Sequence, residues 1–355
     1  MNGFFKKHPI LSGFLKAILF CIIFFGICEI TLRIHLGKLS GRNRGEGNPE
    51  FKPHPTVFWR LRPNLDMLMK MPPKTNRQFT IKTNSRGLRS DEISLRKPRN
   101  GYRILCLGDS ITYGHGVDSQ FTYEKQLERI LQEKYPDKKV QVINGGCPGY
   151  TSFQGLYILE NIGLKYDPDL LIVGFCYADP AAEMKKDSDR VEKNPILRKI
   201  KEILYESELY LLLRRVRLDE INPEGLPPDG YQLTSLRVPL PEYRRIMLKF
   251  AGIMGKQKGY VIYLSLPNAE PDPFPYYADY RAECKDVAKK TGNFYIDLDA
   301  VFDSQPNPLL LYLPSVHPDE TVDRIHPNEE GFAIFAEEIA RVIIENRLVE
   351  KSGKK

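Results

Sequence analysis

The sequence predicts a three-layer α/β/α sandwich around a parallel sheet of about five strands, preceded by one N-terminal transmembrane helix. After residue 101, short and nearly continuous apolar runs alternate with amphipathic helical stretches, which is typical of a parallel sheet covered on both faces. A separate apolar segment lies near the N-terminus. The chain has 355 residues, 42% hydrophobic and 27% charged, which suits one large domain with appendages.

The N-terminal segment divides into a short tail, residues 1–9, and a predicted membrane anchor, residues 10–34. The run ILSGFLKAILFCIIFFGICEITL carries only two charges, Lys16 and Glu29. At about 1.5 Å per residue it can span a hydrocarbon core of roughly 30 Å. No small-x-small site follows it, so an uncleaved anchor is favoured over a cleaved signal peptide. Lysines and arginines flank both ends, so their distribution does not set the orientation.

Two segments connect the anchor to the main domain. Residues 35–56 contain GKLSGRNRGEGNPEFKPHP, which is rich in glycine, proline and charge and predicts a tether. Residues 57–100 contain the alternating FTIKTNS and then RGLRS, which predict a strand and a turn. This second segment is too short to fold alone, so we expect it to pack on the main domain as a β appendage.

Residues 101–350 form the predicted main domain. Its expected strands are YRILCLG, KVQVING, DLLIVGF, YVIYLSL and FYIDL, separated by helices such as SQFTYEKQLERILQEKY and EYRRIMLKFAGIMGKQKG. An insertion at about residues 181–240 is helical and amphipathic. It could be a lid or substrate wall, a basic face at the membrane surface, or a solvated helix. The final helix is expected to bury one stripe, formed by Phe332, Phe335, Ile339 and Val342.

Composition argues against several classes of protein. The net charge is +7 and the basic residues are scattered, so nucleic acid is not an expected partner. The six cysteines include no C-x-x-C pair, which argues against a zinc site or a redox motif. The sequence therefore calls for no metal and no cofactor.

The stretch CLGDSITYG places Ser110 directly after the first strand of the domain and at the start of a helix. Ligands of such folds bind at the carboxyl ends of the strands, and the unpaired N–H groups of a helix N-terminus can stabilise an oxyanion. Ser110 is therefore a candidate nucleophile. Its alternative role is that of an ordinary helix cap, since serine and aspartate are favoured at that position.

A serine nucleophile needs a base, and His326 is the best candidate among six histidines. In DRIHPNEEG, Asp323 lies three residues before His326. That spacing lets a single turn bring the carboxylate to one imidazole nitrogen and leaves the other free for the serine proton. The other histidines lie near the anchor, in the tether, along the loop after the serine, or without an upstream acid: His8, His35, His54, His115 and His317.

GDSITYG together with DRIHPNEEG resembles the SGNH hydrolase superfamily, also called GDSL esterases and lipases, over roughly residues 101–347. The anchor and IKTNSRGLRSDE look like a membrane-tethered bacterial branch of it. The resemblance implies a flavodoxin-like sandwich, a serine hydrolase acting on ester bonds, and a catalytic domain in the periplasm or outside the cell. By similarity, Ser110 would be the nucleophile, His326 the base and Asp323 the residue that orients it.

The family usually completes its oxyanion hole with the N–H of the serine, a glycine in a second block and an asparagine in a third. Gly149 in NGGCPGYTS is the best match for the glycine. In VGFCYADP, Ala178 occupies the asparagine position, with Asp179 retained. Losing one donor can cost about 3 kcal/mol of transition-state stabilisation. A slow enzyme, a substitute donor such as Tyr177 or Asn144, and a changed task stay open.

The predicted function is hydrolysis of a carboxylic ester, such as an O-acetyl group on an envelope glycan, through an acyl-enzyme. Acyl transfer to a sugar hydroxyl through the same serine is one alternative, and a catalytically degenerate glycan-binding module is another. The α/β-hydrolase fold is disfavoured, because its nucleophile elbow needs G-x-S-x-G and Thr112 occupies the second glycine position. The expected partners are an acyl-ester substrate and the membrane.

Overall fold

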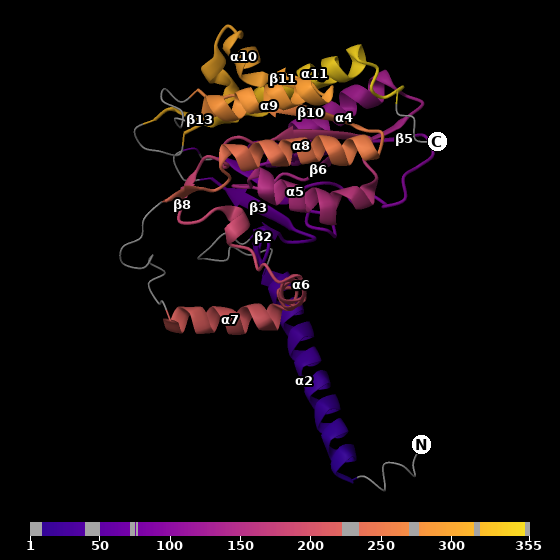
Figure 1. Cartoon of the computed structure of the whole chain (residues 1–355), viewed down its shortest axis with the longest axis vertical. Helices are drawn as coiled ribbons and strands as arrows, with labels where there is room; N and C mark the ends of the chain where they lie inside the picture. The colour runs from indigo at the N-terminus through magenta and orange to yellow at the C-terminus, as the bar shows by residue number, and fades with distance from the viewer. Residues whose placement is uncertain are drawn as a thin grey trace.

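A five-stranded parallel sheet forms the centre of the molecule, in the order β11-β10-β7-β5-β6 (Figure 1). The computed structural model describes residues 9–39, 50–71, 75, 77–221, 234–269, 277–315 and 320–351. The predicted sandwich is confirmed, and the five expected apolar runs are its five strands. Their bounds are β5 (Gly101–Gly108), β6 (Lys139–Asn144), β7 (Leu170–Gly174), β10 (Tyr260–Ser265) and β11 (Phe294–Asp297).

Helices cover both faces of this sheet because its strands have no polar face. Leu105, for example, is fully buried and lies opposite Ile143 on one neighbouring strand and Leu171 on the other. Helices α5, α8 and α9 pack beside one another on one face, and α4 packs against α11 on the other. Their bounds are α4 (Tyr123–Lys134), α5 (Ser152–Asn161), α8 (Leu240–Lys256), α9 (Tyr277–Thr291) and α11 (Glu329–Glu345).

The buried stripe of α11 differs slightly from the expected one. Phe332, Phe335 and Ile339 are fully buried, as expected. Val342 is only half-buried, and Ile343 is fully buried instead. The stripe rotates because small Ala336 and Ala340 also lie against the sheet side of the helix.

The path of the chain through the sheet creates a topological switch point beside β5. From β5 the chain passes through α4 to β6 on one side, and then crosses back through α5 to β7 on the other side. At such a switch point the loops after adjacent strands separate, and ligands of open α/β sheets bind there. Ser110 is the second residue after β5, so it lies at this switch point.

Two antiparallel hairpins precede the sheet, β1 (Phe51–His54) with β2 (Phe58–Leu61) and β3 (Asp66–Lys70) with β4 (Gln78–Lys82). Strand β1 belongs to the segment expected to be a tether, whose residues 40–49 lie outside the described residues. The sequence of this strand has no alternating apolar pattern that would predict it. The strand is stabilised by backbone pairing with β2 and by ion pairs of Lys52 with Glu206 and Glu208. Lys52 itself is only 4% exposed.

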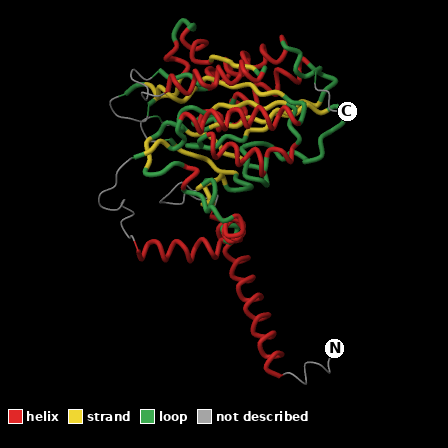
Figure 2. Tube along the Cα trace, viewed as in Figure 1, coloured by secondary structure: helices red, strands yellow, loops and turns green. Residues whose placement is uncertain are grey.

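Helix α2 (Pro9–Leu39) projects from the domain as a separate rod (Figure 2). Its segment Gly13–His35 has a mean hydropathy of 2.3 and exposes its apolar side chains, among them Phe24 and Ile27. The helix is thus long and apolar enough to cross a membrane or to serve as a signal sequence.

The insertion between β7 and β10 contains two helices, α6 (Pro195–Leu204) and α7 (Glu208–Ile221). A two-residue pair, β8 (Ala182–Glu183) with β9 (Ser235–Leu236), closes its base. Residues 222–233 lie outside the described residues. Three further short elements complete the fold near its C-terminal end: α10 (Leu298–Asp303), β12 (Tyr312–Pro314) and β13 (Val322–Pro327).

Candidate active site

Ser110 is the first residue of α3 (Ser110–Tyr113), which is a single turn rather than the first turn of a long helix. The carboxylate of Asp109 caps this turn by accepting from the N–H of Ile111 at 3.0 Å. Gly114 ends it in the left-handed region, with φ of 83°. The first long helix, α4, begins only at Tyr123. A one-turn helix has little dipole, so the electrostatic contribution at Ser110 comes from individual N–H groups.

The structure brings Ser110, His326 and Asp323 into one hydrogen-bonded line. His326 Nε2 lies 2.9 Å from Ser110 Oγ, and His326 Nδ1 lies 2.8 Å from Asp323 Oδ2. Burial alone would raise the pKa of Asp323, but hydrogen bonds from His326 and from two backbone N–H groups hold it below its ordinary value. An ionised Asp323 accepts a hydrogen bond from the Nδ1–H group of His326, and this tautomer leaves Nε2 with a lone pair toward Ser110.

Asp323 and His326 belong to strand β13, whereas the sequence suggested a turn before the last helix. The strand pairs irregularly with β12 and departs from ideal geometry around Asp323. There the Asp323 carboxylate accepts from the N–H groups of Ile325 and His326, at 3.0 and 3.1 Å. The local turn therefore exists, but it lies inside the strand and is closed by the side chain of Asp323.

His115 lies against His326, although the sequence suggested that it points along the loop. The two imidazole centroids are 4.7 Å apart, and the ring of Phe79 also packs on His115, with centroids 5.9 Å apart. Burial, together with the nearby His326, lowers the pKa of His115 to about 4. His115 is therefore neutral near pH 7, and it packs against the His326 ring without placing a second positive charge beside the imidazolium. In the sequence, the one indication of this role is that His115 directly follows Gly114, the glycine that ends the turn α3. His317 lies outside the described residues.

The two residues considered as substitutes for the missing asparagine, Asn144 and Tyr177, make different contacts. Asn144 donates its side-chain N–H to the carbonyl of Thr112 at 2.7 Å and accepts from the N–H of Gly146 at 2.9 Å. Its amide thus ties the second block to the nucleophile turn. The Tyr177 ring packs on Tyr277, with centroids 5.3 Å apart. Ala178, which the resemblance aligns with the asparagine, is half-buried.

Gly149 lies in a loop that requires a glycine. Its φ is 72°, and a Cβ there would come within 3.2 Å of the Trp59 ring. The carbonyl of Gly149 accepts from the guanidinium of Arg237 at 2.7 Å. The indole N–H of Trp59 donates to the neighbouring carbonyl of Pro148 at 3.0 Å. Residues of the β appendage and of the insertion therefore hold this loop from two sides.

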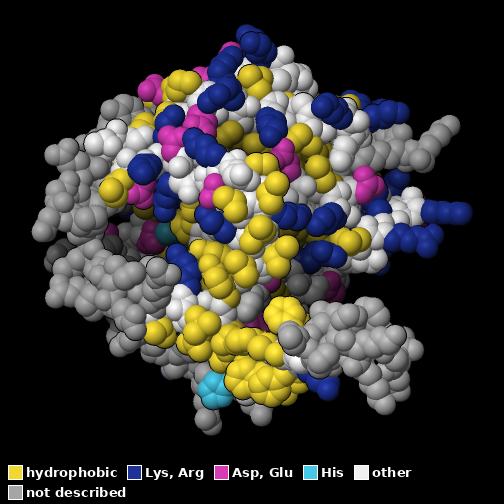
Figure 3. Space-filling model, turned by 60° about the horizontal axis from the view of Figure 1, so that its bottom comes forward, with side chains coloured by type: hydrophobic (Ala, Val, Ile, Leu, Met, Phe, Trp, Pro, Cys, Tyr) yellow, Lys and Arg dark blue, Asp and Glu magenta, His cyan; other side chains and the backbone are white. Residues whose placement is uncertain are grey.

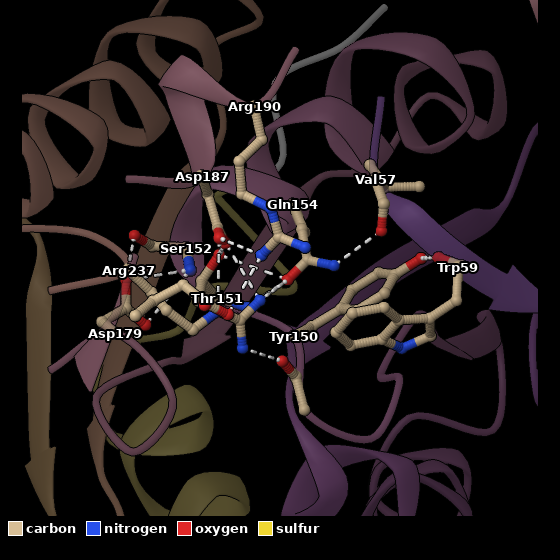
Figure 4. Close-up of polar contacts among 12 residues, drawn as sticks. Val57, Trp59, Tyr150, Thr151, Ser152, Gln154, Asp179, Asp187, Arg190 and Arg237 are labelled. Carbon is tan, nitrogen blue, oxygen red and sulfur yellow. Dashed lines mark hydrogen bonds and ion pairs between the residues drawn. The ribbon is translucent and has the colours of Figure 1, made fainter. Parts of the chain in front are cut away.

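Arg237 belongs to a buried polar cluster that sequence reasoning missed (Figure 4). Its guanidinium donates to Asp187 Oδ2 at 3.0 Å and to the side-chain oxygen of Gln154 at 2.8 Å. Asp187 is fully buried and also accepts from the hydroxyl of Thr151 at 2.8 Å. The ion pair with Arg237 compensates the negative charge of Asp187 in the protein interior. Arg237 and Asp187 both lie in the insertion, where nothing in the sequence distinguished them from solvated charges.

Asp179, the retained member of the third block, is fully buried in the same cluster. It accepts from the N–H of Ser152 at 3.0 Å and from the hydroxyl of Ser152. Burial raises the pKa of Asp179 to about 7, and the hydrogen bonds from Ser152 oppose that rise. Asp179 thus ties the loop after β7 to the start of α5, directly after the loop that contains Gly149. In the described part of the chain, no group of histidine, cysteine, aspartate and glutamate side chains could hold a metal ion.

Comparisons with known proteins found one family model and several similar structures. The sequence model of the GDSL-like lipase/acylhydrolase family matches residues 106–334. A lipase/acylhydrolase structure from Enterococcus faecalis is 17% identical, with 69% of this chain and 96% of that chain covered and a TM-score of 0.46. The acetylxylan esterase Axe2 from Geobacillus stearothermophilus is 17% identical, with coverages of 73% and 98% and a TM-score of 0.43. No curated protein matches the chain.

Proposed function

The chain belongs to the GDSL-like lipase/acylhydrolase family, and we propose that Ser110 is the nucleophile with which it hydrolyses a carboxylic ester through an acyl-enzyme. The family membership makes the protein an ester-hydrolysing enzyme. The observation that carries the assignment of the residues is the hydrogen-bonded line of Ser110, His326 and Asp323. Such a line connects a nucleophile to a base and the base to its orienting carboxylate.

In this mechanism His326 Nε2 accepts the proton of Ser110 as Oγ attacks the acyl carbon. The ester oxygen then leaves with the proton that His326 returns, and the acyl group stays on Oγ. Water attacks the acyl-enzyme in the second half, again giving its proton to Nε2, and the acid departs as Ser110 is restored. Asp323 stays ionised and stabilises the imidazolium formed in each half.

The proposed oxyanion hole has two backbone donors, the N–H groups of Ser110 and Gly149. The support for Gly149 is its place in the second block and the contacts of Trp59 and Arg237 that hold its loop. The alanine at position 178 removes the side-chain donor that the family usually has. We therefore expect a slower enzyme than relatives with all three donors.

The substrate class stays a prediction. We propose an O-acyl group, such as an O-acetyl group on an envelope glycan, and a glycan hydroxyl could replace water in the second half. If transfer occurs, excess glycan acceptor will lower the yield of free acid. If the alanine marks a degenerate binding module, a fluorophosphonate probe will fail to label Ser110.

The test of the proposed chemistry uses short-chain aryl esters with wild type, Ser110→Ala, His326→Ala and the double variant. Each single change should remove most of the turnover, and the double change should add little, because the two residues act as one unit. Fluorophosphonate labelling should likewise disappear in Ser110→Ala. Independent, multiplicative losses in the two single variants would contradict the assignment.

We also propose that α2 is an uncleaved single-pass anchor with the catalytic domain on the periplasmic or outer side. The support is the length and hydropathy of α2 and the lack of a cleavage site after it. Full-length protein should stay in the membrane pellet after alkaline carbonate washing, while a chain starting near residue 45 should be released. A C-terminal reporter that is active only in the cytoplasm would refute the orientation.

A further inference from the structure

Helix α6 is amphipathic, but its apolar face points to the outside and its polar face points to the domain. This is the opposite of the usual arrangement on a water-soluble domain. The apolar stripe of α6 faces outward, with Ile196, Ile200 and Ile203 exposing 70%, 47% and 65% of their surface. These positions recur at helical spacing, so they form one continuous face. The exposed Leu197 and Leu204 widen it. Water would disfavour this arrangement, since the burial of such apolar side chains is favourable.

The polar face of α6 is the one that contacts the protein. Glu202 accepts from the hydroxyl of Thr56 at 2.9 Å and from the hydroxyl of Tyr157 at 3.0 Å. A cavity of about 550 Å³ separates the rest of this face from α5, and Arg198 and Lys199 line it. The orientation of α6 is therefore determined by specific polar contacts, which direct its apolar face away from the domain.

Helix α7 continues the exposed apolar surface. Leu212, Leu213 and Val216 are exposed by 45%, 59% and 51%, on adjoining positions of the helix. Figure 3 shows the side of the molecule from which α2 descends, and hydrophobic side chains gather there with lysine and arginine side chains around them. Helices α6 and α7 lie at the α2 end of the domain (Figure 1).

The start of α7 is joined directly to α2. The carboxylate of Glu29 accepts from the hydroxyl of Ser207 at 2.8 Å and from the N–H groups of Glu208 and Leu209, both at 3.0 Å. Arg33 donates to the carbonyl of Glu206 at 2.7 Å. A residue of α2 therefore caps the N-terminus of α7, and α7 runs across the direction of α2 in Figures 1 and 2.

The position of Glu29 along α2 sets the depth of this junction. Glu29 lies in the C-terminal part of the apolar segment Gly13–His35, toward the end of α2 that meets the domain, and it pairs with Arg33 one turn further along. These two charged side chains are expected at the polar interface of the bilayer rather than at its centre. A helix that starts at Glu29 and runs across α2 lies along the plane of that interface.

The junction is also joined to the catalytic domain. Arg60 forms an ion pair with Glu206 at 2.7 Å, and Arg62 forms one with Glu208 at 3.1 Å. The ammonium of Lys52 lies 3.4 Å from the carboxylate of Glu206. The hairpin β1–β2 thus connects the corner between α6 and α7 to the rest of the molecule.

We propose that α6 and α7 form a membrane platform, whose apolar faces lie in the interfacial layer of the same bilayer that α2 crosses. The proposal rests on the proposed anchoring of α2. The platform would hold the domain in one orientation above the lipid. In Figure 1, α7 lies on the same side of the molecule as β13, the strand that contains His326. Basic side chains on α7, Arg214 and Arg215, suit anionic head groups at the same level.

The test measures how lipid-exposed the platform is in the full-length protein. Cys21 and Cys28 are replaced by serine, and the four other cysteines are buried. A nitroxide is attached at Ile203→Cys on α6, at Leu213→Cys on α7, or at the control Leu310→Cys, a leucine 68% exposed near β12. Each protein is reconstituted in vesicles of phosphatidylcholine and phosphatidylglycerol. Relaxation by oxygen, which concentrates in lipid, is compared with relaxation by a water-soluble nickel chelate.

The ratio of oxygen to nickel accessibility should be at least threefold higher at positions 203 and 213 than at position 310. Equal ratios at all three positions would overturn the platform. Shielding from both reagents, with spin–spin broadening between chains, would instead show that a second copy covers the surface, and would also overturn it.

Vesicle flotation and aryl-ester turnover of the same samples distinguish failure of the platform from failure of the proposed anchoring. Chains that float and turn over ester but keep water-exposed labels contradict the platform alone, whereas chains that fail to float contradict the anchoring as well.

Discussion

Ser110 and His326 lie 216 residues apart in the chain, and each is oriented by an aspartate close to it in sequence. Asp109 caps the turn that begins with Ser110, and Asp323 holds the imidazole of His326. His115 also packs on the imidazole of His326. Contacts within each segment therefore orient Ser110 and His326. The tertiary fold brings these two segments together.

At the same scale, the alanine at position 178 makes a directional prediction. Ala178→Asn should add a third donor to the developing oxyanion and raise kcat with little change in KM, because the gain arises only in the transition state. We expect an increase of up to about tenfold, below the full worth of such a donor, because the new amide lacks supporting contacts. Steady-state kinetics on one aryl ester measures it.

Tyr177→Phe is the matched comparison for this change. If the hydroxyl of Tyr177 already serves the oxyanion, its removal should lower kcat, and Ala178→Asn should then lower activity by competing with it. If neither substitution changes kcat, position 178 does not adjoin the oxyanion and the assignment of the third block fails.

At the scale of elements, segments outside the sandwich position the site. Arg89 of the β appendage is buried and donates to the carbonyls of Tyr113, Gly114 and Val117, so it holds the nucleophile turn from behind. Arg237 of the insertion holds the carbonyl of Gly149. The appendage and the insertion are therefore parts of one scaffold around the sheet edge.

This scaffold predicts that Arg237 acts as a positioning residue. Arg237→Lys keeps a positive charge beside Asp187 but cannot reproduce the three contacts of the guanidinium. We expect kcat to fall about tenfold or more with a smaller change in KM, because a displaced Gly149 N–H weakens transition-state binding. Arg190→Lys is the control, since Arg190 approaches Asp187 only at 3.5 Å from the exposed side. Thermal unfolding should verify that both variants are folded, and a folded Arg237→Lys with wild-type kcat would contradict the role.

At the scale of the whole molecule, one buried carboxyl couples stability to pH. Glu124 of α4 is 1% exposed, and burial raises its pKa to about 8. Between its ordinary pKa and that value, the folded protein keeps a proton that the unfolded chain has lost. The free energy of unfolding therefore falls as pH rises through this window, by up to about 1.4 kcal/mol per pH unit.

Glu124→Gln should remove this dependence. Its melting temperature should exceed that of wild type by a margin that grows from pH 5 to pH 8, measured on the full-length protein in detergent. Glu128→Gln, on the same helix and beside Lys125, is the control and should show no such growing margin. A constant difference between Glu124→Gln and wild type across the range would show that Glu124 is ionised in the folded state.

The sequence by itself determined the features that depend on local pattern. Apolar runs marked the five strands, because a strand buried on both faces needs no other information. Ser110 followed from its place after β5, and the pairing of Asp323 with His326 followed from a spacing of three residues. The family resemblance rests on these same two blocks. The apolar segment of α2 was evident from length and hydropathy alone.

Only the tertiary structure decided the contacts between distant segments. His115, Arg89 and Arg237 look like ordinary polar residues until the fold places them against His326, the nucleophile turn and the loop of Gly149. The sequence of α6 shows that the helix is amphipathic, but only its contacts through Glu202 show that the apolar face points outward. Such choices depend on which partner each side chain meets, and the partners are brought together by the packing of the whole chain rather than by any pattern along it.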